Sequence, residues 1–281
     1  MSLGIVFKGP EGIVIAADSR VTLNAQFKHP NGEIIILPST FDNATKLLKI
    51  SKQNRVGIVT FGLGAIGKKD PRTAHSFIPE FEAKINKEDK GIMTVENFAN
   101  TLSEFFMHQW SELQMPNPNE YNADPMVFLV AGYDDETSPY GRVYEITIPK
   151  MPKAIEKIKD EFGAIWGGQR EYVDRLINGY DGNFLQIAKA QLNLNDTQTK
   201  ELEDSCSKNL SIKIPYQFLP LQDCVDLSIF LIRATINLQQ WTVGIRGVGG
   251  AIDVATITRV EGFKAIQEKR VIGEKIQGAL L

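Results

Sequence analysis

Residues 3–22 read LGIVFKGPEGIVIAADSRVT, in which two runs of β-forming residues flank a cluster of turn-forming residues at positions 9–12. This pattern predicts an antiparallel hairpin of two strands. With the turn at residues 9–12, pairing places Ser2 opposite Ser19 and beside Asp18, because directly opposed side chains have Cβ atoms about 4.5–5.5 Å apart. The second residue of the chain is therefore expected beside an acidic side chain.

Beyond the hairpin, the pattern alternates between strand pairs and helices. Further strands are expected at residues 46–51, 56–61, 126–134, 142–148, 153–159, 163–168 and 252–260. Helices are expected at residues 71–86, 94–113, from about 169, and at 220–240. This order favours antiparallel sheets with helices on their outer faces, an α+β fold, and we expect one domain over residues 1–281. We expect insertions at two stretches that interrupt this pattern. Residues 24–40 show no periodicity, and residues 192–214 form a polar segment or an exposed helical hairpin.

Composition excludes several classes of function. The 281 residues carry 31 basic and 34 acidic side chains, a net charge of −3, so there is no overall basic field for nucleic acid or an anionic membrane. No apolar run approaches the roughly 20 residues of a membrane helix, and the N-terminus lacks the basic region of a signal peptide. The only two cysteines, Cys206 and Cys224, fit a reducing compartment. We expect a cytoplasmic protein without nucleic-acid or membrane partners.

Ser2 is a candidate nucleophile. Removal of Met1, which precedes a small residue, would leave Ser2 with both a hydroxyl and a free α-amine. The reference pKa of an α-amine is about 7.7–8.0, so a useful neutral fraction exists to accept the hydroxyl proton. The hairpin alone leaves open the simpler interpretation that Ser2 only leads into a strand.

The stretch GIVFKGPEGIVIAADSRVT closely resembles the opening of proteasome β subunits. Counting back from Asp18 without a gap, the nucleophile position of that family, normally threonine, falls on Ser2. The resemblance continues in the same order at KLLKIS (46–51), VGIVTFGLGA (56–65), VFLVAGYDD (127–135), GRVYEI (141–146) and GGAIDVATITR (249–259). It implies a bacterial or archaeal proteasome-like relative, an N-terminal nucleophile (Ntn) hydrolase with a four-layer αββα sandwich.

The same resemblance implies roles for five residues. Asp18 would orient a basic group, and Lys46 would point at the nucleophile and assist proton transfer. The Gly62 backbone N–H would hold the oxyanion, a contribution of roughly 10²–10³ in rate. Arg20 would be a structural ion-pair partner, and Ser19 would support the site. Residues 24–40 lengthen the connection from Arg20 to Lys46 relative to the family, and we expect them to form a loop over the substrate groove.

Two positions depart from the family. Its usual serine before the helix near Gln169 is replaced by Trp166-Gly167-Gly168. Its usual aspartate at the end of the last helix is replaced by residues 237–241, which contain Gln239 and no acid. Both family residues support the N-terminal amine, so the resemblance leaves the orientation and pKa of that amine open, and with them the activity.

Other motifs are weaker. Residues 62–67 form a literal GxGxxG, but residues 68–71 interrupt where a dinucleotide site requires a helix. His29, His75 and His108 have no metal-ligand spacing, so neither a metal nor a cofactor is expected.

The resemblance therefore implies a peptidase, of the threonine-type endopeptidase family with serine as nucleophile, acting on peptides or unfolded proteins. A self-compartmentalising, ring-shaped homo-oligomer is expected, with any unfoldase partner unidentified. The alternatives are an inactive structural ring subunit, an Ntn amidase acting on a small non-peptide amide, and a globular binding module.

Overall fold

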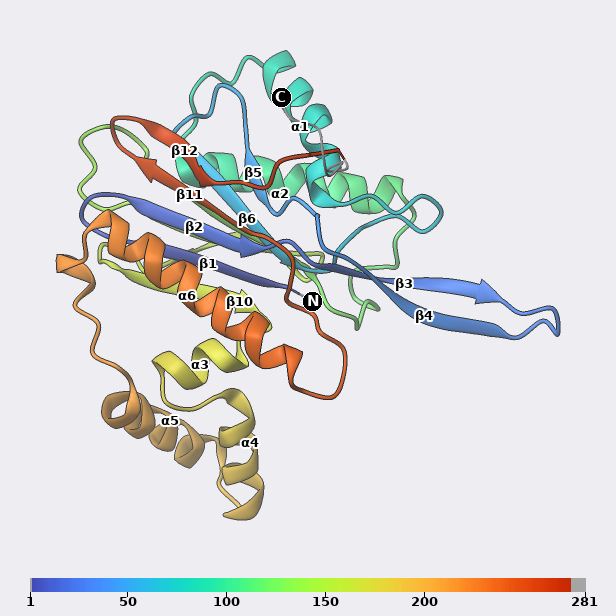
Figure 1. Cartoon of the computed structure of the whole chain (residues 1–281). Helices are drawn as coiled ribbons and strands as arrows, with labels where there is room; N and C mark the ends of the chain where they lie inside the picture. Colours follow the sequence, from blue (N-terminus) through green and yellow to red (C-terminus); the bar gives the residue numbers. More distant parts are fainter. Residues whose placement is uncertain (1, 274–281) are drawn as a thin grey trace, which may run out of the picture.

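Two five-stranded sheets form the centre of the molecule (Figure 1). The computed structural model describes residues 2–273, without the side chains of residues 24–27, 34 and 36. The first sheet has the order β10-β1-β2-β11-β12, with β1 (Leu3–Lys8), β2 (Ile13–Asp18), β10 (Gly163–Gly168), β11 (Ile252–Thr258) and β12 (Gly262–Gln267). The second has the order β5-β6-β7-β8-β9, with β5 (Leu47–Lys49), β6 (Val56–Gly62), β7 (Met126–Gly132), β8 (Arg142–Ile148) and β9 (Met151–Lys157). Every pairing in the two sheets is antiparallel.

Three hydrophobic clusters show how helices and sheets pack. Helices α1 (Ile78–Lys87) and α2 (Val95–Glu112) cover the second sheet, with Phe98 and Phe106 fully buried against it. Helices α3 (Glu171–Ile177) and α6 (Leu221–Gln240) cover the first sheet. A third cluster joins side chains of both sheets, among them Ile15 and Leu129. The chain is thus mixed α/β, with helices on the outer faces, as the sequence indicated at this coarse level.

The N-terminal hairpin has the predicted register. Gly4 pairs with Ala17 and Lys8 with Ile13, and the Gly9 N–H donates to the Gly12 carbonyl over 2.9 Å. Every residue of β1 and β2 is buried, because both strands lie between other strands of the sheet and between layers. This central position holds the end of β2 rigidly beside the start of β1.

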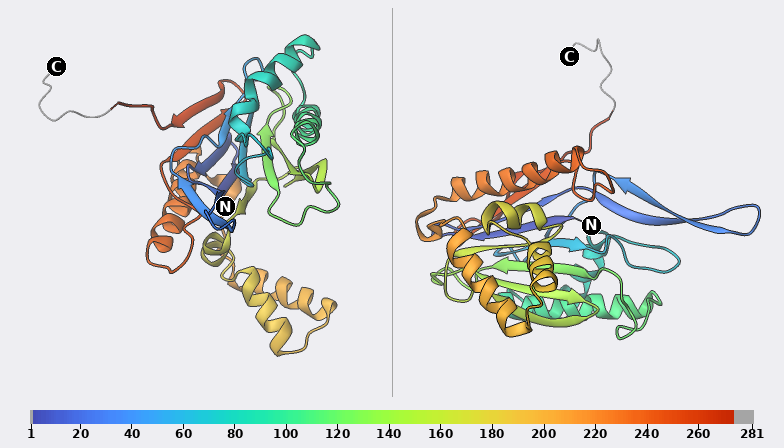
Figure 2. Two further views of the ribbon diagram at one scale, coloured as in Figure 1. Left: turned by 90° about the vertical axis from the view of Figure 1, so that its right-hand side faces the viewer. Right: turned by 90° about the horizontal axis from the view of Figure 1, so that it is seen from below.

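The prediction that residues 24–40 form a loop is wrong. They belong to β3 (Val21–Lys28) and β4 (Ile34–Phe41), which pair along their whole length as a two-stranded arm projecting from the body (Figures 1 and 2). Residues 29–32 form the turn at the tip, where the Gly32 N–H donates to the His29 carbonyl over 2.8 Å and Gly32 has a φ of +88°. Among the side chains of the arm that the structure describes, only Val21 is buried, so burial imposes no alternating pattern on them.

Three further boundaries differ from expectation. The strand predicted as the last, β11, is followed by β12. The predicted helix 71–86 begins later, as a short 3-10 turn (η1, Ala74–Phe77) that leads into α1. The polar segment 192–214 contains α5 (Asp196–Leu210), and its partner α4 (Gly182–Gln191) begins earlier than predicted; the pair extends from the body as a helical hairpin (Figure 2). Beyond α5, a second short 3-10 turn (η2, Tyr216–Phe218) precedes α6.

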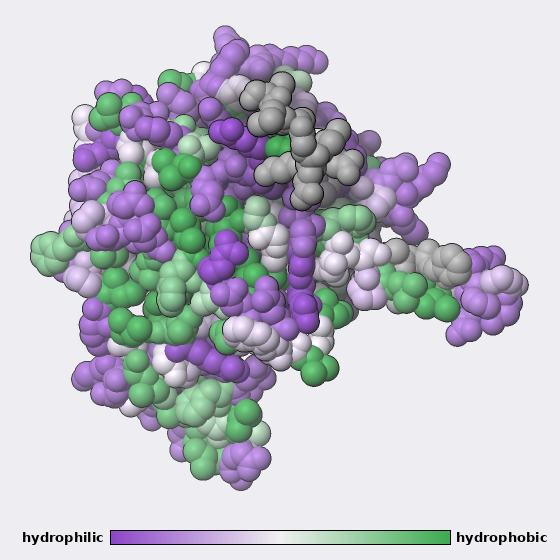
Figure 3. All heavy atoms as spheres, viewed as in Figure 1, coloured by the Kyte–Doolittle hydropathy of each residue, from purple (hydrophilic) through white to green (hydrophobic). Residues whose placement is uncertain are grey.

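Within residues 2–273, no helix combines the length and apolar character needed to cross a bilayer. Apolar residues are interspersed with polar ones on the face that carries α6 and β11, and the tip of the arm is hydrophilic (Figure 3). Cys206 and Cys224 are both buried free thiols.

Candidate active site

Asp18 is the centre of a buried hydrogen-bond network at the end of β2. Its side chain is fully buried. Its Oδ1 accepts from the Leu3 N–H over 3.0 Å and from Lys46 Nζ over 2.7 Å. Its Oδ2 accepts from the Arg20 N–H over 3.0 Å and from the Gly249 N–H over 2.9 Å. Four donors therefore compensate the burial of this carboxylate, and one of them lies directly after Ser2.

Lys46 lies directly before β5 and is only 5% exposed. Its Nζ donates to Asp18 and, over 2.5 Å, to the Arg20 carbonyl. Burial lowers the pKa of Lys46, and the nearby cations Lys269 and Arg20 lower it further, whereas the attraction of Asp18 opposes both effects. A lysine in this environment gives up a proton more readily than one in water.

Ser2 is 4% exposed and precedes β1. Its carbonyl accepts from the Gln169 N–H over 2.7 Å, which ties the start of the chain to the end of β10. Ser2, Lys46 and Gly62 line one cavity, with about 20 Å³ of room, enough for a single water. Met1, whose removal the nucleophile hypothesis requires, lies outside the described residues.

Gly62 ends β6 in a conformation that favours glycine. Its φ is +85°, and a Cβ atom there would lie 2.1 Å from the Pro125 carbonyl oxygen. The GxGxxG at residues 62–67 does not open a helix; Ile66 and Arg72 instead form an isolated bridge. Since β6 is antiparallel to both of its neighbours, the parallel strand arrangement of a dinucleotide site is absent around this motif.

Arg20 and Ser19 lie on the two sides of the network. Arg20 forms a bidentate ion pair with Asp42, with Nε and Nη2 at 2.5 and 2.8 Å from the carboxylate oxygens. Ser19 is fully buried, and its hydroxyl donates to Asp253 over 3.5 Å. Asp253 also forms an ion pair with Lys269. Both residues support the backbone around Asp18 and do not face the cavity that Ser2 lines.

The last two residues of β10 are glycines at positions where a serine side chain would meet its neighbours. A Cβ atom on Gly167 would lie 2.2 Å from the Phe61 ring of the opposite sheet. Gly168 has a φ of +93°, and a Cβ atom there would lie 1.9 Å from the Ser2 carbonyl oxygen. Neither position accommodates a side chain without a shift of its neighbours.

An amide pair lies at this end of the site. Gln239 Nε2 donates to Gln169 Oε1 over 2.6 Å, and Gln239 Oε1 accepts from the Val248 N–H over 3.0 Å. The sequence showed glutamine at both positions, but the pairing was missed because 70 positions separate the two residues. The resemblance had placed an acid at the Gln239 position, and a neutral side chain occupies it.

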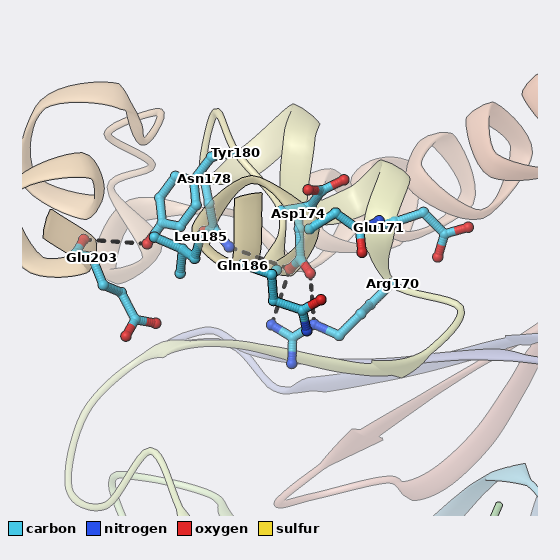
Figure 4. A pocket seen from close by; sticks show the side chains of 11 residues that line it. Arg170, Glu171, Asp174, Asn178, Tyr180, Leu185, Gln186 and Glu203 are labelled. Carbon is cyan, nitrogen blue, oxygen red and sulfur yellow. Dashed lines mark hydrogen bonds and ion pairs between the residues drawn. The ribbon is translucent and has the colours of Figure 1, made fainter. Parts of the chain in front are cut away.

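A wider pocket lies elsewhere, between α3 and the α4–α5 hairpin (Figure 4). Its volume is about 560 Å³, and its lining includes the ion pair of Arg170 with Asp174. Neither Ser2 nor Lys46 belongs to it, so pocket size does not identify the chemistry here. Within residues 2–273, no group of three or more His, Cys, Asp and Glu side chains is arranged to hold a metal ion.

Comparison with known proteins shows similarity in fold. No family model matches the sequence, and no curated protein matches it. Among solved structures, the chain is similar to a Gly-1 mutant of Anbu from Hyphomicrobium sp. strain MC1, with a TM-score of 0.50 and 14% identity over 98% of this chain and 89% of that one. At 14% identity this similarity shows that the two chains share a fold.

Proposed function

We propose that this protein is an Ntn hydrolase that cleaves amide bonds with Ser2 as nucleophile after removal of Met1. The observation that carries the proposal is the buried pair of Asp18 and Lys46, joined through the Leu3 N–H to the residue after Ser2. A buried ion pair is a costly feature, and it contributes less to stability than its Coulomb energy suggests. Lys46, one member of the pair, lines the same cavity as Ser2 and Gly62, which favours a role in catalysis.

The proposed reaction has two stages. In the first, Ser2 Oγ attacks the amide carbonyl carbon, and the hydroxyl proton passes to the Ser2 α-amine, directly or through a water. The Gly62 N–H stabilises the oxyanion of the tetrahedral intermediate. Collapse of this intermediate breaks the C–N bond, and the leaving amine takes the proton from the α-ammonium. In the second stage, a water attacks the Ser2 ester, and its proton returns through the α-amine to Oγ as the acid product leaves.

The charges around Ser2 suit this chemistry. The Asp18 carboxylate holds Lys46 Nζ at 2.7 Å, so the cation stays close to the cavity when charge develops there. Burial keeps the local dielectric low, which strengthens the influence of that cation on a developing oxyanion.

The arrangement of helices and sheets also supports the proposal of an Ntn hydrolase fold and of a ring-shaped assembly. Helices α1 and α2, the two sheets, and helices α3 and α6 are consistent with an αββα Ntn sandwich. We propose a ring-shaped homo-oligomer as the working form, acting on peptides or unfolded proteins. An isolated two-stranded hairpin is marginally stable in water, so the projecting β3–β4 arm favours contacts with another copy of the chain.

The decisive experiment is intact mass spectrometry before and after incubation with a peptide epoxyketone, a probe that requires a hydroxyl and a neighbouring free amine. The expected result is loss of Met1 and a covalent adduct that is absent in Ser2→Ala. Ser19→Ala is the matched control, because its hydroxyl is also buried but donates to Asp253. A retained Met1, or an adduct that persists in Ser2→Ala, would refute the proposal.

A second candidate is an Ntn amidase acting on a small non-peptide amide. The narrow cavity beside Ser2, with room for about one water, favours a small substrate. A monomer or dimer by light scattering, together with a Ser2-dependent adduct and no cleavage of peptide libraries, would support this candidate.

A further inference from the structure

Helix α6 has an outer face that points away from the first sheet (Figure 1). The buried residues of α6, among them Leu231 and Ile232, lie on the side that packs against the sheet. With 3.6 residues per turn, the opposite side is centred on Phe230, which is 55% exposed. The α4–α5 hairpin extends to another side of the molecule (Figure 2). The outer face of α6 consists of Asp226, Leu227, Phe230, Arg233 and Ala234.

The charged and apolar residues of the outer face lie on its two separate edges. Asp226 and Arg233, four positions before and three after Phe230, turn to one edge, and both are exposed. Leu227 and Ala234, three positions before and four after, turn to the other edge, and both are half-buried. Each edge therefore carries two residues that lie at similar distances on either side of Phe230.

The two charges on the outer face are available to a partner. Asp226 accepts one hydrogen bond, from Gln222 Nε2 over 2.9 Å, and this donor is neutral. Arg233 forms no ion pair within residues 2–273. One acidic and one basic side chain thus stand side by side along one edge of the helix without a charged partner in the described part of the chain.

We propose that the outer face of α6 binds the same face of a second copy of this chain, about a two-fold axis that passes close to Phe230. In such a pair the helices are antiparallel, and residues at equal distances before and after the axis meet. Asp226 of one copy faces Arg233 of the other, and symmetry forms the same ion pair a second time. On the other edge, Leu227 meets Ala234 in the same way.

Large apolar side chains at the two ends of α6 extend this self-complementarity. Phe218, just before the helix, is 75% exposed, and Trp241, at its C-terminal cap, is 78% exposed. They lie almost equally far along the chain from Phe230, so antiparallel pairing brings Phe218 of one copy towards Trp241 of the other. Buried aromatic side chains supply most of the affinity of protein interfaces, whereas exposed ion pairs mainly fix register and orientation.

This contact differs from the one that would close a ring. Neighbours around a ring meet through two different surfaces, whereas a two-fold contact uses one surface twice. In the ring-shaped assembly proposed above, α6 would therefore join two rings, and without a ring it would join two chains. The inference goes beyond the proposed reaction and depends on none of its steps.

The test exchanges the two charges. Asp226→Arg turns both ion pairs into contacts between arginines, and Arg233→Asp turns both into contacts between aspartates. The double variant Asp226→Arg/Arg233→Asp restores both pairs with reversed polarity. An equimolar mixture of the two single variants restores them as well, because one chain is then positive at both positions and the other is negative at both. Sedimentation velocity of the full chain at near-physiological salt measures the mass of each assembly.

We expect each single variant to weaken the contact at least about tenfold and so to halve the mass of the assembly, because symmetry repeats each like-charge contact. The double variant and the mixture should regain the wild-type mass. Phe230→Ala should also reduce the mass, and no exchange of charge should restore it. Glu104→Arg, a charge reversal at an exposed position of α2 on the other side of the molecule, is the matched control and should leave the mass unchanged.

Wild-type mass in both single variants would overturn the inference, and so would a double variant and a mixture that both fail to regain that mass. Thermal unfolding verifies that each variant is folded, and Asp226→Lys with Arg233→Glu repeats the exchange if one is not. A wild type that stays monomeric at every concentration would also overturn the inference, but it would leave the Ser2 adduct experiment to decide the proposed reaction separately.

Discussion

Replacing Asp18 with asparagine removes the charge that holds Lys46 and changes one acceptor oxygen into a donor nitrogen. Of the four donors now bonded to this side chain, two would face that nitrogen, whichever way the amide is turned. Lys46, 5% exposed, would keep its hydrogen bond to the Arg20 carbonyl but lose its charged partner. The variant leaves side-chain volume almost unchanged, so its effect comes from charge and hydrogen bonding.

The expected cost follows from the kind of interaction that is broken. Removing one partner of a buried ion pair costs about 3–5 kcal/mol, because the other charge stays buried without compensation. Lys46→Met removes the other partner, but Asp18 keeps three backbone N–H donors in that variant. We therefore expect Lys46→Met to cost less, about 1.5–3 kcal/mol, the range for a hydrogen bond to a charged group.

Urea unfolding at pH 7.5 measures both free energies, and thermal unfolding should show Asp18→Asn melting roughly 6–20 °C below the wild type, at about 2–4 °C per kcal/mol. The ranking is the critical result. If Lys46→Met destabilises the protein as much as Asp18→Asn, the backbone donors do not hold the carboxylate, and the network as described is refuted.

Two further predictions concern the same region. Burial lowers the pKa of Lys46 in the folded protein below the ordinary 10.5. Between the folded pKa and the unfolded pKa, the unfolded chain therefore binds more protons than the folded protein. The free energy of unfolding should consequently rise with pH across that window. Lys46→Met should lack this rise when unfolding is measured from pH 7.5 to 10; equal slopes in the two proteins would contradict the buried environment. Gly167→Ser should destabilise the protein by about 1–3 kcal/mol, because its Cβ atom would lie 2.2 Å from the Phe61 ring. The penalty should shrink when the same change is made in Phe61→Leu, and an equal penalty in both backgrounds by urea unfolding would rule out this clash.

Several local features of the chain could be predicted from the sequence alone. The turn at residues 9–12 set the register of the first hairpin, and that register placed Asp18 beside the start of β1, because neighbouring strands and a short turn constrain each other directly. The helix predicted at residues 94–113 matches α2 closely, and in the structure the Thr94 hydroxyl caps it by accepting from the Asn97 N–H. The arm at residues 21–41 was not predicted because residues 24–40 show no periodicity, although Asn31-Gly32 is a hairpin signal.

The sequence by itself determined the α+β character, the N-terminal hairpin and the proximity of Ser2 to Asp18, all of which depend on residues close together in the chain. Only the tertiary structure decided how the site is supported. The Gly249 N–H reaches Asp18 across 231 positions, and Gln239 reaches Gln169 across 70. Gly167 is kept small by Phe61 from the facing sheet. Contacts of this kind arise when separate layers pack against each other, and the periodicity within one segment carries no information about which residue of another layer it will meet.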